Sequence, residues 1–172
     1  MPMLAALAVS IGVLAVLATW LFLEPLAAFD AQVWQAFIAW ACFYHSGGKT
    51  AGARIAVVGM TFGAVVGMAS VLLANQLGVL GSLAAPIAVG IGAAVIVLSS
   101  QLPLLATIPA SVYGFAAIAG LMLLGTDMTP VKALWPTILS IVIGAGFGYA
   151  SESLAGVLAK KKAAAAVGGA AG

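Results

Sequence analysis

GAVVGMASVLLA at residues 63–74 and GAGFGYASESLA at residues 144–155 are nearly the same stretch, repeated after 81 positions. Seven of the twelve positions are identical. A shorter pair, AVSIG at 8–12 and AVGIG at 88–92, recurs after 80 positions. These matches indicate a duplicated unit of roughly 80 residues, with chance identity in an Ala- and Gly-rich chain as the alternative.

The composition predicts a membrane protein. The chain is 65% hydrophobic and 6% charged, whereas soluble domains carry about 25% charged residues. So few charges cannot cover a water-soluble surface, and lipid is therefore the expected partner. The net charge of +2 comes mostly from Lys160–Lys162, so no basic patch points to nucleic acid. A single cysteine excludes a disulfide within the chain.

Six apolar runs are candidates for membrane-spanning helices. The first lacks the basic start of a signal peptide, so we expect it to be retained. Gly125–Asp127 is expected to end the fifth run, and Thr129–Pro130 to begin the sixth. The predicted spans are residues 3–23, 27 or 30–45, 50–74, 83–98, 104–124 and 129–158.

The predicted fold is all-α, with six transmembrane helices arranged as two inverted three-helix repeats. An odd number of helices per repeat turns the two copies in opposite directions across the bilayer. The repeats are expected at residues 1–80 and 81–158, followed by a basic, then Ala/Gly-rich, disordered cytoplasmic tail at 159–172. Six spans place five of the six Lys and Arg residues on one side, which predicts cytoplasmic termini.

Small residues recur every four positions in the third and sixth spans. Such stripes let another helix backbone approach closely. One interpretation is that these two spans cross each other at the centre of the molecule, and the alternative is general close packing. The helix-crossing candidates are Gly59, Gly63, Gly67, Gly144 and Gly148.

A solute path is predicted along the second span and the start of the fifth. The second span concentrates aromatic residues, which either line a path or form an interfacial belt. Two proline-containing segments, residues 99–103 and 107–111, surround the junction of the fourth and fifth spans. This junction is either a re-entrant break at membrane depth or a turn followed by a helix kinked at Pro109. The candidate path residues are Phe37, Trp40, Phe43, Tyr44, Ser99, Gln101, Thr107, Ser111 and Tyr113.

Two titratable residues are candidates for a proton relay or gate. His45 is the only histidine and ends the second span, where it is either an interfacial residue or a pH-sensitive gate. Glu152 is the only acidic residue well inside an apolar run. It is either a proton or cation site or a side chain that reaches out to water.

The segment AFIAWACFYHSGG at residues 36–48, with the surrounding hydropathy, resembles a family of small bacterial inner-membrane proteins catalogued only as a domain of unknown function. The resemblance covers roughly residues 1–158. It implies the bacterial inner membrane as the location and implies no substrate.

The expected function is a channel or facilitator for a small polar or weakly charged solute, with its path between the repeats. Comparable six-helix pores usually assemble as closed rings of identical subunits, so we expect a homo-oligomer, for which a trimer is one candidate. The alternatives are a proton- or ion-coupled transporter and a non-transporting accessory subunit of a larger membrane complex. The sequence carries no metal-ligand cluster, cofactor motif or catalytic set, so we expect no cofactor, no metal and no enzyme.

Overall fold

The computed structural model describes residues 1–124 and 128–168, and all regular structure in these ranges is helical. Two short 3₁₀ segments, η1 (Ala27–Phe29) and η2 (Gly78–Leu83), connect longer helices. The α-helices of the described residues are α1 (Met3–Leu23), α2 (Val33–His45), α3 (Lys49–Gln76), α4 (Ala84–Ser99), α5 (Ile108–Leu123) and α6 (Pro130–Gly168).

Local sequence signals explain where several helices begin and end. α1 has the predicted bounds, because Pro2 precedes its first turn and Glu24–Pro25 stops it. The tight turn between α2 and α3 needs two glycines, Gly47 and Gly48, which have φ angles of 88° and 69°. This turn keeps α2 and α3 adjacent in the chain and in space.

Among the described residues, four segments are long and apolar enough to cross a membrane, which marks the chain as a membrane-like helical protein. They are α1, α3, residues 78–99 and the first 30 residues of α6. α2, with 13 residues, is about 20 Å long, and α5 has only 16 residues. The hydrocarbon core is about 30 Å thick, so neither α2 nor α5 is long enough to cross it alone. Both helices are also shorter than the predicted second and fifth spans.

Pro109 does not kink a helix, contrary to one of the two sequence interpretations. α5 begins at Ile108, so Pro109 lies in its first turn, where a missing N–H costs nothing. Residues 100–107 form an irregular connection between α4 and α5. The predicted end of the fifth span at Gly125–Asp127 lies outside the described residues.

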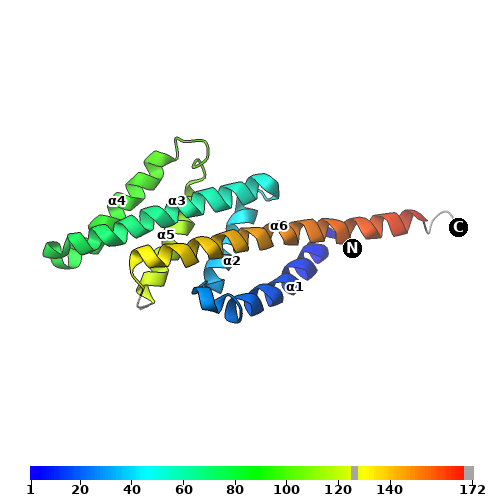
Figure 1. Cartoon of the computed structure of the whole chain (residues 1–172). Helices are drawn as coiled ribbons and strands as arrows, with labels where there is room; N and C mark the ends of the chain where they lie inside the picture. Colours follow the sequence, from blue (N-terminus) through cyan, green and yellow to red (C-terminus); the bar gives the residue numbers. More distant parts are fainter. Residues whose placement is uncertain (125–127, 169–172) are drawn as a thin grey trace.

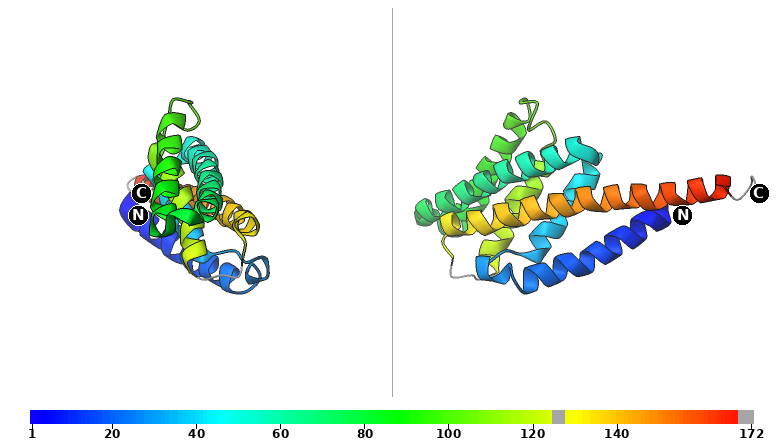
Figure 2. Two further views of the ribbon diagram at one scale, coloured as in Figure 1. Left: turned by 90° about the vertical axis from the view of Figure 1, so that its left-hand side faces the viewer. Right: turned by 45° about the vertical axis from the view of Figure 1, so that its right-hand side comes forward.

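α3 and α6 lie side by side and run in opposite directions (Figures 1 and 2). α4 and α5 pack against α3, whereas α1 and α2 pack against α6. We call these groups the α3 unit (α3, α4 and α5) and the α6 unit (α1, α2 and α6). Side chains of α2, α3, α5 and α6 form the main core, and α1 and α4 lie at its periphery.

The C-terminal tail differs from its prediction. α6 continues to Gly168, so the backbone of residues 163–168 is helical where disorder was expected. Alanine has the highest helix propensity, and four consecutive alanines at 163–166 prolong the helix. Residues 169–172 lie outside the described residues.

Candidate functional site

Glycines bring the short helices α2 and α5 into direct backbone contact with their neighbours. A Cβ atom at Gly63 of α3 would collide with the carbonyl oxygen of Ser111 on α5. A Cβ at Gly144 of α6 would collide in the same way with the carbonyl oxygen of Ala36 on α2. Gly63 and Gly144 are thus the points where the backbones of the two short helices lie directly on the long helices, and we call them glycine seats.

The two small-residue stripes therefore mark helix crossings, but not with each other. Gly59 and Gly67 contact Ala110 and Ile118 of α5, and Gly148 contacts Phe43 of α2. Spacing shows which face of a helix is smooth and leaves open which helix packs there. α3 and α6 do lie side by side, as the interpretation of crossing spans expects, but the glycines of their stripes pack on α5 and α2.

These contacts define corresponding positions in the two units. Gly63 and Gly67 lie 81 positions before Gly144 and Gly148. Their partners on α5, Ser111 and Ile118, both lie 75 positions after the partners on α2, Ala36 and Phe43. The two short helices therefore meet the two long helices at equivalent places.

A buried polar group lies where α2 meets α5 and α6. Gln35 is fully buried, and its Nε2 donates to the carbonyl of Ala117 at 2.9 Å and to Thr137 Oγ1 at 3.1 Å. Its Oε1 has no partner among the described residues, and neither has the buried Nε1 of Trp34. Trp34 lies over Gly120 of α5, so both side chains lie at the α2–α5 contact.

Ser111 supplies a third unpartnered polar atom, on α5. The residue is 1% exposed, and its Oγ has no hydrogen-bond partner within the described ranges. All three such atoms therefore belong to the two short helices. The sequence predicted Ser111 as a path residue but gave no role to Gln35 or Thr137, although an amide within the apolar second span was an available signal.

An aromatic cluster joins α2 to α6: the side chains of Trp40 and Tyr44 both form hydrogen bonds with Ser151. Ser151 Oγ donates to the Gly148 carbonyl at 2.7 Å. It accepts from Trp40 Nε1 at 3.0 Å and from the Tyr44 hydroxyl at 2.8 Å, which fills its bonding capacity. Ser10 of α1 donates to the Ser151 carbonyl at 2.9 Å. Trp40 and Tyr44 thus have structural partners, and sequence reasoning missed Ser151 as their common centre.

Glu152 has a role that neither sequence interpretation named. Its Oε2 accepts the backbone N–H of Lys49 at 2.6 Å, and its other oxygen lies against Gly48. A carboxylate at the start of α3 satisfies a free N–H and complements the positive end of the helix dipole. Glu152 therefore caps α3 from α6.

His45 and Tyr113 join the ends of α2 and α5. The Tyr113 hydroxyl and His45 Nδ1 are 3.0 Å apart, and His45 is exposed. Two predicted gate residues, His45 and Glu152, therefore lie in the same end region, each bound to another helix. Within the described ranges, no group of three or more His, Cys, Asp or Glu side chains could hold a metal.

The remaining predicted path residues do not share one cavity. Phe37 is 39% exposed and stacks on Trp40, whereas Phe43 is fully buried in the core. Ser99 ends α4, Gln101 is exposed in the following connection, and Thr107 precedes α5. The sequence grouped residues that are close in the chain, and the tertiary packing separates them.

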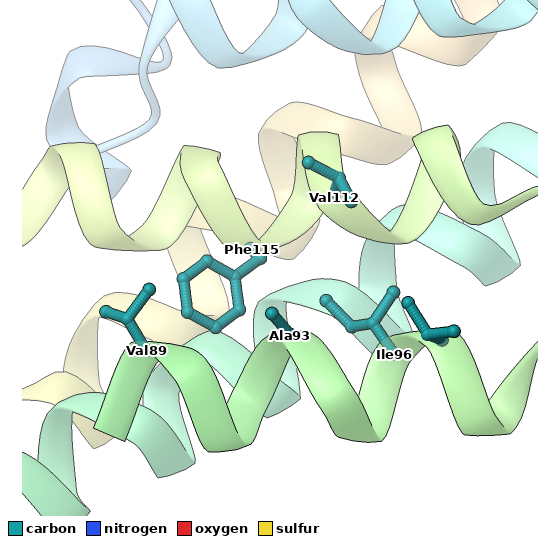
Figure 3. Close-up of a pocket in the computed structure, with 6 residues that line it drawn as sticks. Val89, Ala93, Ile96, Val112 and Phe115 are labelled. Atoms are coloured by element: carbon teal, nitrogen blue, oxygen red, sulfur yellow. The ribbon is translucent and has the colours of Figure 1, made fainter. Parts of the chain in front are cut away.

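A cleft opens in the α3 unit between α4 and α5 (Figure 3). It has a volume of about 220 Å³, and the Phe115 ring lies between the two helices, opposite Val89 and Ala93. A neighbouring pocket of about 280 Å³ shares Phe115 and includes Ser70 and Ala119. In the α6 unit, the space between Phe37, Trp40 and Phe147 has no room for a water molecule.

Comparison with known proteins gives a family and no function. No curated protein and no solved structure matches the chain. A protein family of unknown function, DUF1097, matches residues 8–156, which is most of the chain and agrees with the resemblance seen in the sequence. The chain belongs to the DUF1097 family.

Proposed function

We propose that this protein is a passive facilitator that moves a small polar or weakly charged solute across a membrane, along α2 and α5. The proposal rests on three buried polar atoms that have no hydrogen-bond partner among the described residues. Gln35 Oε1, Trp34 Nε1 and Ser111 Oγ are all buried, and all belong to the two helices that are too short to span the bilayer alone.

The energetics favour a polar occupant beside these atoms. An unpaired buried polar group costs about 1–3 kcal/mol, and lipid offers it no hydrogen bond. Polar groups at membrane depth are tolerated where they line a path for water or solute. A solute that accepts from Trp34 and donates to Gln35 would satisfy both groups in passing.

The matched contacts of α2 and α5 support an inverted repeat in which α1–α3 and α4–α6 are the two copies. Each short helix packs on the long helix of the other copy, and Gly63 and Gly144 seat them equivalently. Transporters built from inverted repeats place their sites at the repeat interface, next to interrupted helices. That interface is where Gln35 meets Ala117.

Passive transport agrees better with the contacts than proton coupling does. Glu152 already accepts a hydrogen bond from Lys49 at the start of α3, and the orphan atoms belong to neutral side chains. We also propose a homo-oligomer in the bacterial inner membrane with both termini in the cytoplasm, in line with the positive-inside bias. The protein has no enzymatic role in this proposal.

The test is stopped-flow light scattering on proteoliposomes of the purified protein with urea, glycerol, formate, acetate and ammonium. The unmodified chain should accelerate one of these solutes over empty liposomes. Gln35→Met keeps the size of the side chain and removes its amide, so it should slow that flux about tenfold. Gln101→Met is the matched control, because Gln101 is exposed in a connection, and it should change nothing.

No flux of any solute, with folded and inserted protein, would contradict passive transport. Flux that appears only with an imposed proton or ion gradient would favour the coupled alternative. A purified protein that is monodisperse only with a second polypeptide would favour the accessory-subunit alternative.

A further inference from the structure

The aromatic cluster of the α6 unit has a counterpart in the α3 unit that is incomplete. The correspondence set by the glycine contacts pairs Trp40 with Phe115, Tyr44 with Ala119 and Ser151 with Ser70. The ring and the serine are kept, but a methyl group replaces the tyrosine side chain. The α3 unit therefore lacks one phenol ring at this place.

A pocket occupies the position of the missing ring. All three counterparts, Phe115, Ala119 and Ser70, line the same pocket of about 280 Å³. An apolar cavity of about 150 Å³ is large enough to bind benzene. The pocket can thus hold one aromatic ring with substituents.

Ser70 supplies a polar contact inside this pocket. The residue is 5% exposed, and its hydroxyl lies against Gly92 of α4. No described residue forms a hydrogen bond with its side chain, whereas the corresponding hydroxyl of Ser151 has three partners. A phenolic O–H would restore the bond that Tyr44 makes to Ser151.

We propose that this pocket binds a small ligand with one aromatic ring and one hydroxyl group, a phenol-like molecule. Its ring lies against Phe115 and fills the space beside Ala119. Its hydroxyl bonds to Ser70 Oγ. The site is independent of the proposed solute path, because none of the unpartnered atoms of α2 and α5 lines it.

The chain offers a matched pair of variants for the test. Ala119→Tyr supplies the missing ring, so it should occlude the pocket. Tyr44→Ala removes the ring from the α6 unit, so it should open a second pocket beside Ser151. The probe is phenol, with toluene as the control that keeps the ring and lacks the hydroxyl.

Binding is measured in nanodiscs by thermal unfolding and by ¹⁹F NMR of 4-fluorophenol. Phenol should raise the Tm of the unmodified chain, because a ligand that binds only the folded state stabilises it. The rise should disappear in Ala119→Tyr and increase in Tyr44→Ala. Ser70→Ala should weaken phenol binding about fivefold and leave toluene binding unchanged, as expected for one lost hydrogen bond.

Three results would overturn the proposal. The first is a rise in Tm that persists in both Ala119→Tyr and Ala119→Phe, which would indicate general partitioning of phenol into the lipid. The second is an unchanged Tm of the unmodified chain together with lipid that native mass spectrometry finds bound and that Ala119→Tyr displaces, which would assign the pocket to an acyl chain. The third is dissociation of an oligomer by Ala119→Tyr, which would assign it to a second copy.

Discussion

The α6 unit and the α3 unit each hold a short helix against glycines of their long helix, and they differ in the side chains around that contact. In the α6 unit, Trp40 stacks between Phe37 and Phe147, with ring centroids 5.9 and 5.6 Å away. In the α3 unit, Val112 and Val66 stand at the positions of Phe37 and Phe147, and a cleft remains. The glycines fix where each short helix packs, and the size of the surrounding side chains determines whether a cleft remains beside it.

The largest expected effect concerns the scaffold that both units share. Gly63→Ala and Gly144→Ala should each destabilise the protein by more than about 3 kcal/mol, because the new methyl group would meet a backbone carbonyl that cannot move aside. Yield of folded protein and unfolding in detergent measure the loss. Gly146→Ala is the control, since nothing lies near its added Cβ. Unequal losses at Gly63 and Gly144 would break the equivalence of the two units.

The next largest effect is a difference in stability between alanine variants of the two corresponding serines, Ser151 and Ser70. Ser151→Ala leaves Trp40 and Tyr44 without their common acceptor and should cost about 2–3 kcal/mol. Ser70→Ala removes no hydrogen bond and should cost less than about 1 kcal/mol. Thermal unfolding followed by tryptophan fluorescence compares them. Equal losses of stability in the two variants would show that the hydrogen bonds of Trp40 and Tyr44 to Ser151 do not stabilise the α6 unit.

A smaller effect is expected at the start of α3. Glu152→Gln weakens the cap on Lys49 and should cost about 1 kcal/mol, while solute flux stays unchanged. The corresponding residue is Val71, so only one of the two units has this cap. Glu24→Gln, at an exposed position, is the control. Loss of flux at full stability would instead make Glu152 a proton carrier.

The smallest effect is expected for Tyr113→Phe. Its hydroxyl bonds to exposed His45, where water can replace the lost partner, so the change should cost less than about 1 kcal/mol. Thermal unfolding measures it, with Tyr149→Phe as the control at an exposed tyrosine. A larger loss would mean that the link between α2 and α5 at this end holds the two units together.

Hydropathy and chain breakers predicted the helices well, and they predicted the partners of those helices poorly. α1 has the predicted bounds because length, Pro2 and Glu24–Pro25 are local signals. The glycines of the third and sixth spans pack on α5 and α2, and residue spacing alone does not say which helix packs on a stripe. The kink at Pro109 was wrong because α5 begins only at Ile108. The helical tail shows that an Ala-rich segment next to a long helix can prolong it.

The candidate site was only partly predictable for the same reason. Aromatic spacing on the second span identified Trp40 and Tyr44, but only the tertiary contacts show that Ser151, more than 100 positions away, joins them. Glu152 was noted as a charge in an apolar run. Its role as a cap needs the start of α3 to lie beside it, and the spacing of residues does not contain that information.

If a polar path runs beside the short helices, a thiol placed on that path should react with a water-soluble reagent. In a Cys42→Ala background, which removes the one native thiol, Ser111→Cys and Val112→Cys place single thiols at a buried and at an exposed position of α5. A small hydrophilic methanethiosulfonate reagent, applied in lipid, should modify Ser111→Cys and block flux. It should leave flux unchanged in Val112→Cys, which lines the apolar cleft between α4 and α5 and lies outside the proposed path. No reaction at Ser111→Cys under any condition of flux would contradict a path at this place.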